Sequence, residues 1–330
     1  MLMSKYDYAG YFNRIREIER LVVPAQEINW LEQYAKPEKS VDVVLYLGCN
    51  VLMTAHLARE VVRVFEALGV SFAAVGGPQF CCGIVHYGHG DRGASTRLTQ
   101  ATVAKFESFG AKEVVMWCPS CNKHFDDVIL RELQPNFTIT HATAYLAARA
   151  DRLPFRHEVH RTVALHSHCG RQQQEADAAA GRTLLEAIPG LRVTGLVEDA
   201  ELDYHCSNVI IEKIGLERFH AIRHRLAEDA AAQGADSIAT LYHSCHREWS
   251  DMREPALDLR SYISLVSESL GISEIDRYQQ YRRSRDVDVT VGAGREAWHS
   301  HGLTEEQARA LARKHFLKSR YETKGSVDSG

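Results

Sequence analysis

Residues 76–83 read GGPQFCCG, and the rest of the sequence is best interpreted outward from the adjacent cysteines in this stretch, Cys81 and Cys82. The apolar run 72–75 predicts a buried strand, and the Gly-Gly-Pro segment after it predicts a turn. Neighbouring residues of an extended segment point to opposite sides, so the pair is poorly placed to hold one small ion. Two such thiols are better placed to reach different metal atoms of a larger cluster.

Three more cysteines follow predicted strands in the same half of the chain. Cys49 comes after the predicted strand 43–47. Cys118 directly follows the predicted strand 114–117, and Cys121 comes three residues later. Helical patterns at 57–68 and 94–109 separate these strands, which favours an α/β layer with a mostly parallel sheet. Because ligands bind in the crevice at the carboxyl ends of parallel strands, we expect all five thiols to converge there.

The number of thiols narrows the kind of metal site. A structural zinc site uses four ligands, so a fifth thiolate would add charge without a function. An iron-sulfur cluster with more than four thiolate ligands accounts for the doublet. The segment CPSC, residues 118–121, also resembles a redox dithiol, but this alternative leaves Cys49 and the doublet unexplained.

The second half of the chain repeats this spacing with substitutions. The displacement from Cys82 to Cys206 is 124 residues, and the displacement from Cys121 to Cys245 is again 124. Predicted strands at 163–165 and 238–241 precede Cys169 and Cys245, and the region 172–204 is predicted to be rich in helix. We interpret the repeat as an internal duplication. His205 and Tyr242 stand where the other two thiols would be, and we expect Tyr242 to be a packing residue.

The predicted fold class is therefore α/β, with two pseudo-symmetric halves, mostly parallel sheets and helical extensions at both ends. Thr304 and Gln307 fit a capping box at the start of a C-terminal helix. The boundary between the halves is expected within 135–154. The predicted domains are an N-terminal helical extension at 1–40, a first half at 41–150, a second and degenerate half at 151–270, and a C-terminal helical extension and tail at 271–330.

Composition excludes several functions. The formal net charge is only −4 and no basic block occurs, so we expect no binding to nucleic acid. No stretch is typical of a signal peptide or a membrane span, which predicts a cytoplasmic protein. Thiols stay reduced in the cytoplasm, so metal binding or redox chemistry is favoured over structural disulfides. No G-x-G-x-x-G fingerprint follows a strand, so flavin and nicotinamide are expected on partner subunits.

The motifs LGCN (47–50), FCCG (80–83) and WCPSC (117–121) resemble the CCG domain found in the B subunit of heterodisulfide reductase and its relatives. The resemblance covers about residues 41–250 in two tandem copies. It implies an oxidoreductase acting on sulfur groups, with a non-cubane 4Fe-4S cluster close to where a disulfide or related sulfur substrate is split or formed. The implied cluster ligands are Cys49, Cys81, Cys82, Cys118 and Cys121, and Cys81 and Cys82 are the expected catalytic residues.

The second motif is incomplete, so what the resemblance implies there is different. Cys169, Cys206 and Cys245 could hold an ordinary 4Fe-4S cluster, with His205 or an outside group on the fourth iron; zinc or no metal are the alternatives. His168 also lies beside a cysteine, where an imidazole could transfer protons.

The resemblance also implies partners, namely an iron-sulfur protein like the reductase's C subunit, a flavoprotein like its A subunit, and a lipoyl-type sulfur carrier protein. The incomplete second motif and the extended ends favour the bacterial sulfur-oxidising complex over the methanogenic enzyme. Two other functions stay open. One is an electron-transfer subunit of a respiratory module that never contacts substrate, and the other is a scaffold whose second half serves only as an interface.

Overall fold

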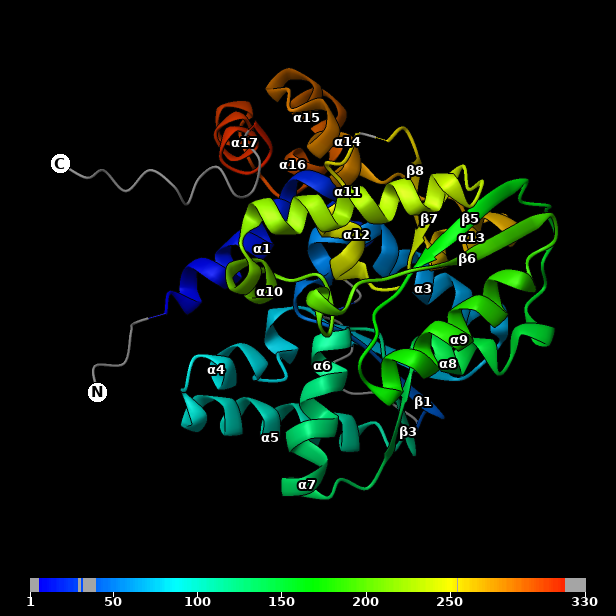
Figure 1. Ribbon diagram of the computed structural model, residues 1–330. Helices are drawn as coiled ribbons and strands as arrows, with labels where there is room; N and C mark the ends of the chain where they lie inside the picture. The colour runs from blue at the N-terminus through cyan, green and yellow to red at the C-terminus, as the bar shows by residue number, and fades with distance from the viewer. Residues whose placement is uncertain (1–5, 29–30, 32–39, 254, 318–330) are drawn as a thin grey trace.

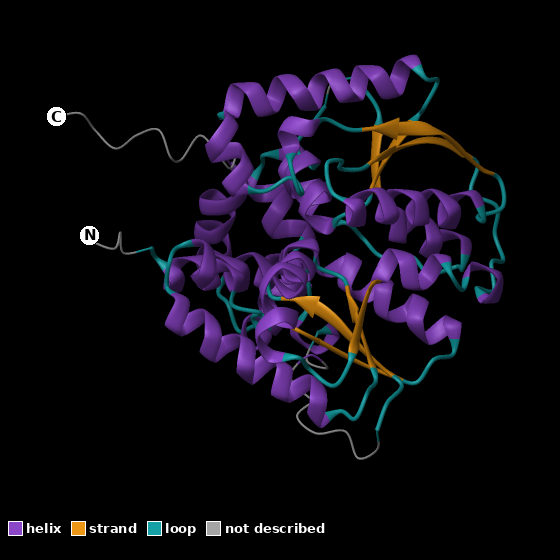
Figure 2. Ribbon diagram, turned by 60° about the horizontal axis from the view of Figure 1, so that its bottom comes forward, coloured by secondary structure: helices purple, strands orange, loops and turns teal. Residues whose placement is uncertain are grey.

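The computed structural model describes residues 6–28, 31, 40–253 and 255–317. Each half of the chain is built on a parallel sheet of four strands (Figure 2). The first sheet has the order β2-β1-β3-β4, and the second has the equivalent order β6-β5-β7-β8. The strands are β1 (Val43–Gly48), β2 (Phe72–Gly76), β3 (Glu113–Met116), β4 (Thr138–His141), β5 (Arg161–His166), β6 (Leu191–Val197), β7 (Ser237–Thr240) and β8 (Asp258–Ser261). The shared order confirms the predicted α/β class with two pseudo-symmetric halves.

Helices cover both sheets and connect their strands (Figure 1). In the first half these are η2 (Asn50–Thr54), α3 (Ala55–Leu68), η3 (Pro78–Phe80), α4 (Ile84–Gly88), α5 (Arg92–Ser108), α6 (Pro119–His124), η4 (Phe125–Ile129), α7 (Leu130–Leu133), α8 (Ala142–Ala147) and η5 (Ala150–Arg152). In the second half they are α9 (Gln172–Glu186), η6 (Ala200–Leu202), α10 (Asn208–Ile214), α11 (Leu216–Ala232), α12 (His243–Trp249) and α13 (Tyr262–Ser269). Crossovers between parallel strands place the carboxyl ends of neighbouring strands along one edge.

The central strands and the edge strand β2 were predictable from the sequence, whereas the edge strands β4, β6 and β8 were not. All six residues of β1 are buried, because this strand lies between β2 and β3 and is covered by helices. Strand β6 lies at an edge and its residues are mostly half-buried, so polar residues interrupt its apolar pattern. The prediction of a helix-rich region at 172–204 was therefore wrong from residue 191 to residue 197. Strands β4 and β8 are also short edge strands, and β4 and α8 occupy the segment where the boundary was expected.

The two extensions pack on each other rather than standing apart. Helix α1 (Tyr8–Val22) contacts α16 (Arg295–Ser300) and α17 (Glu305–Ala312), and its apolar stripe is buried. The remaining elements are η1 (Ala25–Glu27), α14 (Arg277–Ser284), α15 (Val287–Ala293) and η7 (Arg313–Leu317). The predicted capping box of Thr304 and Gln307 is present at the start of α17. The predicted tail after residue 317 lies outside the described residues.

Buried polar contacts join the parts of the chain. The Ser264 hydroxyl on α13 donates to the Glu60 carboxyl on α3 at 2.6 Å. Asp276, before α14, lies 2.6 Å from Nε2 of His246 on α12 and 3.5 Å from Nε2 of His56 on α3. The first half, the second half and the C-terminal extension therefore meet at one carboxylate. Within the described residues, no helix combines the length and apolarity needed to cross a bilayer.

Candidate metal centre

The five cysteines of the first half lie at one edge of the first sheet. Cys49 directly follows β1, the doublet lies between η3 and α4 after β2, and Cys118 and Cys121 start α6 after β3. Since β2, β1 and β3 are adjacent and parallel, their carboxyl ends bring these loops together. All five side chains are at most 5% exposed. The structure thus gathers the five thiols that the sequence pattern singled out.

The backbone is shaped to let these loops approach one another. Gly48 has φ +80°, and a Cβ atom added there would lie 2.7 Å from Cβ of Cys118 and 3.3 Å from Sγ of Cys121. Only glycine allows both this left-handed turn and this close approach. On the other side, the hydroxyls of Thr99 and Thr102 on α5 donate to the carbonyls of the doublet at 2.8 and 3.0 Å. These contacts fix the doublet segment with its thiols facing the other loops.

The thiols are paired electrostatically. A hydrogen bond from Cys49 lowers the pKa of Cys81, and the backbone N–H of Gly83 donates to the same sulfur at 3.4 Å. A hydrogen bond from Cys121 likewise lowers the pKa of Cys118 well below its ordinary value. The donating thiols respond in the opposite direction, because the hydrogen bond to Cys81 raises the pKa of Cys49. Thiolates therefore form most readily at two positions from different loops, which suits a donor set for metal.

The spread of the sulfur atoms distinguishes a cluster from a single ion. Among the described residues, none of the five cysteines belongs to a group of three or more ligand atoms within 4.8 Å of one another. A single tetrahedral ion needs such a group, whereas a polynuclear iron-sulfur cluster is held by thiolates that reach separate atoms.

A buried guanidinium on α12 gives a second indication. Nε of Arg247 lies 3.1 Å from the Glu248 carboxylate, but its Nη1 has no hydrogen-bond partner among the described residues. Arg247 is 6% exposed, so water does not readily replace the missing partner. The positive charge of Arg247 acts on Tyr11, whose hydroxyl lies beside Cys49, so this N–H donor without a partner is near the thiol site and fits an anionic group there. The site therefore fits an iron-sulfur cluster.

The second half and the N-terminal helix cover this site. The hydroxyl of Tyr11 on α1 lies 3.9 Å from Sγ of Cys49. Tyr204 donates to the carbonyl of Pro119 at 2.6 Å, and Nε2 of His205 lies 2.7 Å from the hydroxyl of Ser120. Figure 1 shows α6 projecting from the first half toward the second. The thiol site is thus closed by segments that are distant in the sequence.

The second half gathers a different set of ligand atoms. Nε2 of His166, Nε2 of His168 and the sulfurs of Cys206 and Cys245 lie within 4.8 Å of one another, and all four residues are buried. The structure does not bring Cys169 or His205 into this group. Sequence reasoning missed His166 and His168 as candidate ligands, although the motif HSHC at the end of a predicted strand was the available signal.

The pairing of the strands explains the position of Cys169. Val43 pairs with Glu113 in the first sheet, and Val163 pairs with Ser237 in the second, so Cys169 corresponds to Cys49. In the second half the glycine with positive φ is Gly170 rather than the residue before the cysteine. Cys169 consequently lies at the partly exposed rim, near Glu198 and Asp199. His205 is directed away from the group, because its nitrogens contact Ser120, Ser244 and the carbonyl of Cys206.

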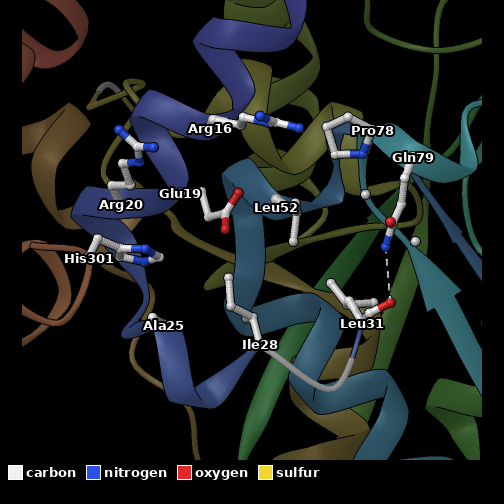
Figure 3. Close-up of a pocket in the computed structure, with 12 residues that line it drawn as sticks. Arg16, Glu19, Arg20, Ala25, Ile28, Leu31, Leu52, Pro78, Gln79 and His301 are labelled. Carbon is white, nitrogen blue, oxygen red and sulfur yellow. Dashed lines mark hydrogen bonds between the residues drawn. The ribbon is translucent and has the colours of Figure 1, made fainter. Parts of the chain in front are cut away.

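A separate pocket borders the segment that leads to the doublet. Its volume is about 320 Å³, and Figure 3 shows Arg16, Glu19 and Arg20 of α1 on one side of it and Pro78 and Gln79 on the other. Among the described residues that line it, none is a cysteine. The pocket is therefore not an open mouth of the thiol site.

Comparison with known proteins agrees with this geometry. The family model described as a cysteine-rich domain, CCG, matches residues 43–126. Residues 43–126 are therefore similar to a CCG domain. The matched residues hold all five cysteines of the first half, whereas the second half of the chain lies outside the match.

Curated relatives extend the comparison. The chain is 27% identical to the D subunit of the dihydromethanophenazine:CoB--CoM heterodisulfide reductase of Methanosarcina barkeri, over 74% of this chain and 63% of that relative. The chain thus spans less than two thirds of that relative's length. Over 84 residues, 24% of this chain and 12% of the relative, it is 29% identical to the EtfAB:quinone oxidoreductase of Syntrophomonas wolfei. A hypothetical protein of Helicobacter pylori has a TM-score of 0.46, with 8% identity over 86% of this chain and 58% of that one.

Proposed function

We propose that this protein is the iron-sulfur subunit of a heterodisulfide-reductase-like complex and takes part in disulfide or sulfane-sulfur redox chemistry. The observation that carries the proposal is the convergence of Cys49, Cys81, Cys82, Cys118 and Cys121 at the carboxyl ends of three adjacent strands. Their spread supports a cluster of the non-cubane 4Fe-4S type implied by the doublet. Such a cluster supplies one-electron redox chemistry when bound.

The residues around the thiols have defined tasks in this proposal. Burial raises the pKa of Tyr11 well above its ordinary value, so the hydroxyl beside Cys49 keeps its proton at neutral pH. The buried guanidinium of Arg247 balances part of the negative charge that the thiolates bring into the interior. The closed shell of Tyr11, Tyr204 and His205 excludes bulk water. The chain's own residues thus hold charge and protons in place at a dry site.

The chemistry at sulfur sets what partners must provide. Splitting a disulfide into two thiols consumes two electrons and two protons, and this chain carries no nucleotide fingerprint to accept a hydride. We therefore propose that it exchanges electrons with an iron-sulfur protein like the C subunit of heterodisulfide reductase and with a flavoprotein like its A subunit. A lipoyl-type sulfur carrier is the proposed source of the substrate. The similarity to one subunit of a heterodisulfide reductase supports this assignment.

A second function is favoured by two observations. The five thiols are at most 5% exposed, and none of them lines the pocket described above. The chain also resembles part of an EtfAB:quinone oxidoreductase. Both fit a protein that passes electrons through its cluster and never contacts a sulfur substrate.

Anaerobic purification with iron, sulfide and electron paramagnetic resonance measurements tests the proposal. We expect iron and labile sulfide in equal amounts, and a large loss of both in Cys81→Ser. Cys169→Ser is the matched control and should keep the iron of the first half. Absence of labile sulfide from the unaltered protein would refute the cluster. Incubating the oxidised protein with a small thiol then separates the two functions, because only a substrate-binding site changes its paramagnetic spectrum.

A further inference from the structure

The buried group in the second half differs from the first site in kind. His166, His168, Cys206 and Cys245 offer two imidazole nitrogens and two sulfurs, all within 4.8 Å of one another and all at most 1% exposed. They lie at or after the carboxyl ends of β5, β6 and β7, which are adjacent in the sheet. We propose that these four side chains form a mononuclear zinc site, so that the degenerate half holds a single redox-inert ion rather than an iron-sulfur cluster.

The separations between the ligand atoms match one tetrahedral ion. Nε2 of His168 lies 3.1 Å from Sγ of Cys245 and 3.9 Å from Sγ of Cys206, and Nε2 of His166 lies 3.5 Å from Sγ of Cys206. Zinc bonds of about 2.3 Å to sulfur and about 2.05 Å to nitrogen place tetrahedral N and S ligands about 3.6 Å apart. The four side chains therefore surround a volume that fits one ion.

The contacts of the two imidazoles orient their lone pairs toward this volume. Nδ1 of His166 lies 3.1 Å from the carbonyl oxygen of Val197, and Nδ1 of His168 lies 3.1 Å from the carbonyl oxygen of Asp203. A carbonyl oxygen only accepts, so each Nδ1 carries the proton and each Nε2 presents its lone pair. Metal-binding histidines are typically held in this way by a backbone carbonyl. Both rings are thus in the tautomer that binds metal.

The duplication shows why this half suits one ion and not a four-iron cluster. By strand pairing, His166 corresponds to Tyr46 and His168 to Gly48. A Cβ atom at Gly48 would already lie against Cys118 and Cys121, and His168 places a whole ring at the equivalent position, stacked on Tyr242 at 5.9 Å. The imidazoles therefore fill the space that the thiols of the first half leave between them.

The site gives the second half a definite role. An ion held by three loops ties the ends of β5, β6 and β7 together, and zinc has no redox chemistry of its own. Cys206 directly follows His205, which contacts Ser120 beside the first thiol site. The zinc site would therefore stabilise the segment of the second half that covers the redox site, without exchanging electrons with the cluster.

Metal analysis of Cys206→Ser/Cys245→Ser tests the assignment, with Cys169→Ser as the matched control. We expect one zinc per chain in the unaltered protein and in the control, loss of that zinc in the double variant, and unchanged iron in all three. Loss of iron with the double substitution, or no zinc in the unaltered protein, would overturn the site.

X-ray absorption at the zinc edge keeps the proposal testable if the double variant does not fold. In the unaltered protein we expect two sulfurs at about 2.3 Å and two nitrogens at about 2.0–2.1 Å. A shell of sulfur alone would refute the proposed ligands. Zinc bound in this way without any labile sulfide would refute the proposed cluster of the first half and leave the zinc site standing, so the two failures are distinguishable.

Discussion

Gly48 offers a sharp test of how the first site is built. In Gly48→Ala the new Cβ atom would lie 2.7 Å from Cβ of Cys118 and 3.2 Å from its sulfur. Ordinary carbon contacts are about 3.5–4.0 Å, so Cys118 has to retreat by roughly 1 Å. Overpacking of a buried site costs about 1–3 kcal/mol, and the left-handed φ adds about 1 kcal/mol for any residue with a Cβ atom.

Gly69 provides the matched control for the backbone cost. It has φ +72°, and a Cβ atom there would meet nothing within 4 Å among the described residues. Gly69→Ala should therefore lower the free energy of unfolding by about 1 kcal/mol and leave iron binding unchanged. Gly48→Ala should lower it by roughly 2–4 kcal/mol. It should also lose most of its iron, because metal ligands tolerate shifts of only about 0.2 Å.

The assay combines anaerobic chemical denaturation with iron and sulfide determination on the same preparations. The comparison between the two variants separates strain in the backbone from displacement of the ligand. Equal losses of stability in the two variants, with full iron in Gly48→Ala, would show that Cys118 is not held against this turn as described.

Three further predictions follow from buried groups. Burial raises the pKa of Glu60 to about 8, so the folded state keeps a proton that the unfolded state releases. The free energy of unfolding should therefore fall by roughly 4 kcal/mol from about pH 4.5 to about pH 8. Chemical denaturation at a series of pH values should show this dependence in the unaltered protein and not in Glu60→Gln. Arg247→Gln should lower the reduction potential on the order of tens of millivolts in a redox titration, whereas Arg171→Gln, at a partly exposed position, should leave it unchanged. Tyr46→Phe removes the buried hydrogen bond to the carbonyl of Phe80, beside the doublet, and should lower the free energy of unfolding by about 2 kcal/mol and reduce the iron content. Tyr281→Phe removes a buried hydrogen bond to the carbonyl of Leu21 and should lower the free energy of unfolding without changing the iron content.

The sequence predicted the convergence of the five thiols because the evidence for it is local. The five cysteines follow three apolar runs that are typical of buried strands, and the structure has a strand at each of them. Adjacent parallel strands bring their carboxyl ends together. The duplication was visible for a similar reason, since the repeat of 124 residues preserves the spacing of Cys82 and Cys121. Both inferences depend only on positions along the chain.

The ligand set of the second half could not be found from that spacing. The first strands of the two sheets are displaced by 120 residues and the third strands by 124, and the pairing of the strands shows which residues of the two halves are equivalent. The strand pairing makes His168 equivalent to Gly48. The change from glycine to histidine places an imidazole among the ligand atoms of the second half. The edge strand β6 escaped prediction because its exposed face carries polar residues.

The closure of the thiol site has a consequence for how the holoprotein is made. With the five sulfurs at most 5% exposed beneath α1 and the second half, a preformed cluster reaches them only when one of these segments moves aside. Maturation is favoured before the last packing step, while the N-terminal helix or the second half still stands away. We therefore expect iron added to the folded apoprotein to be taken up more slowly than iron added during refolding.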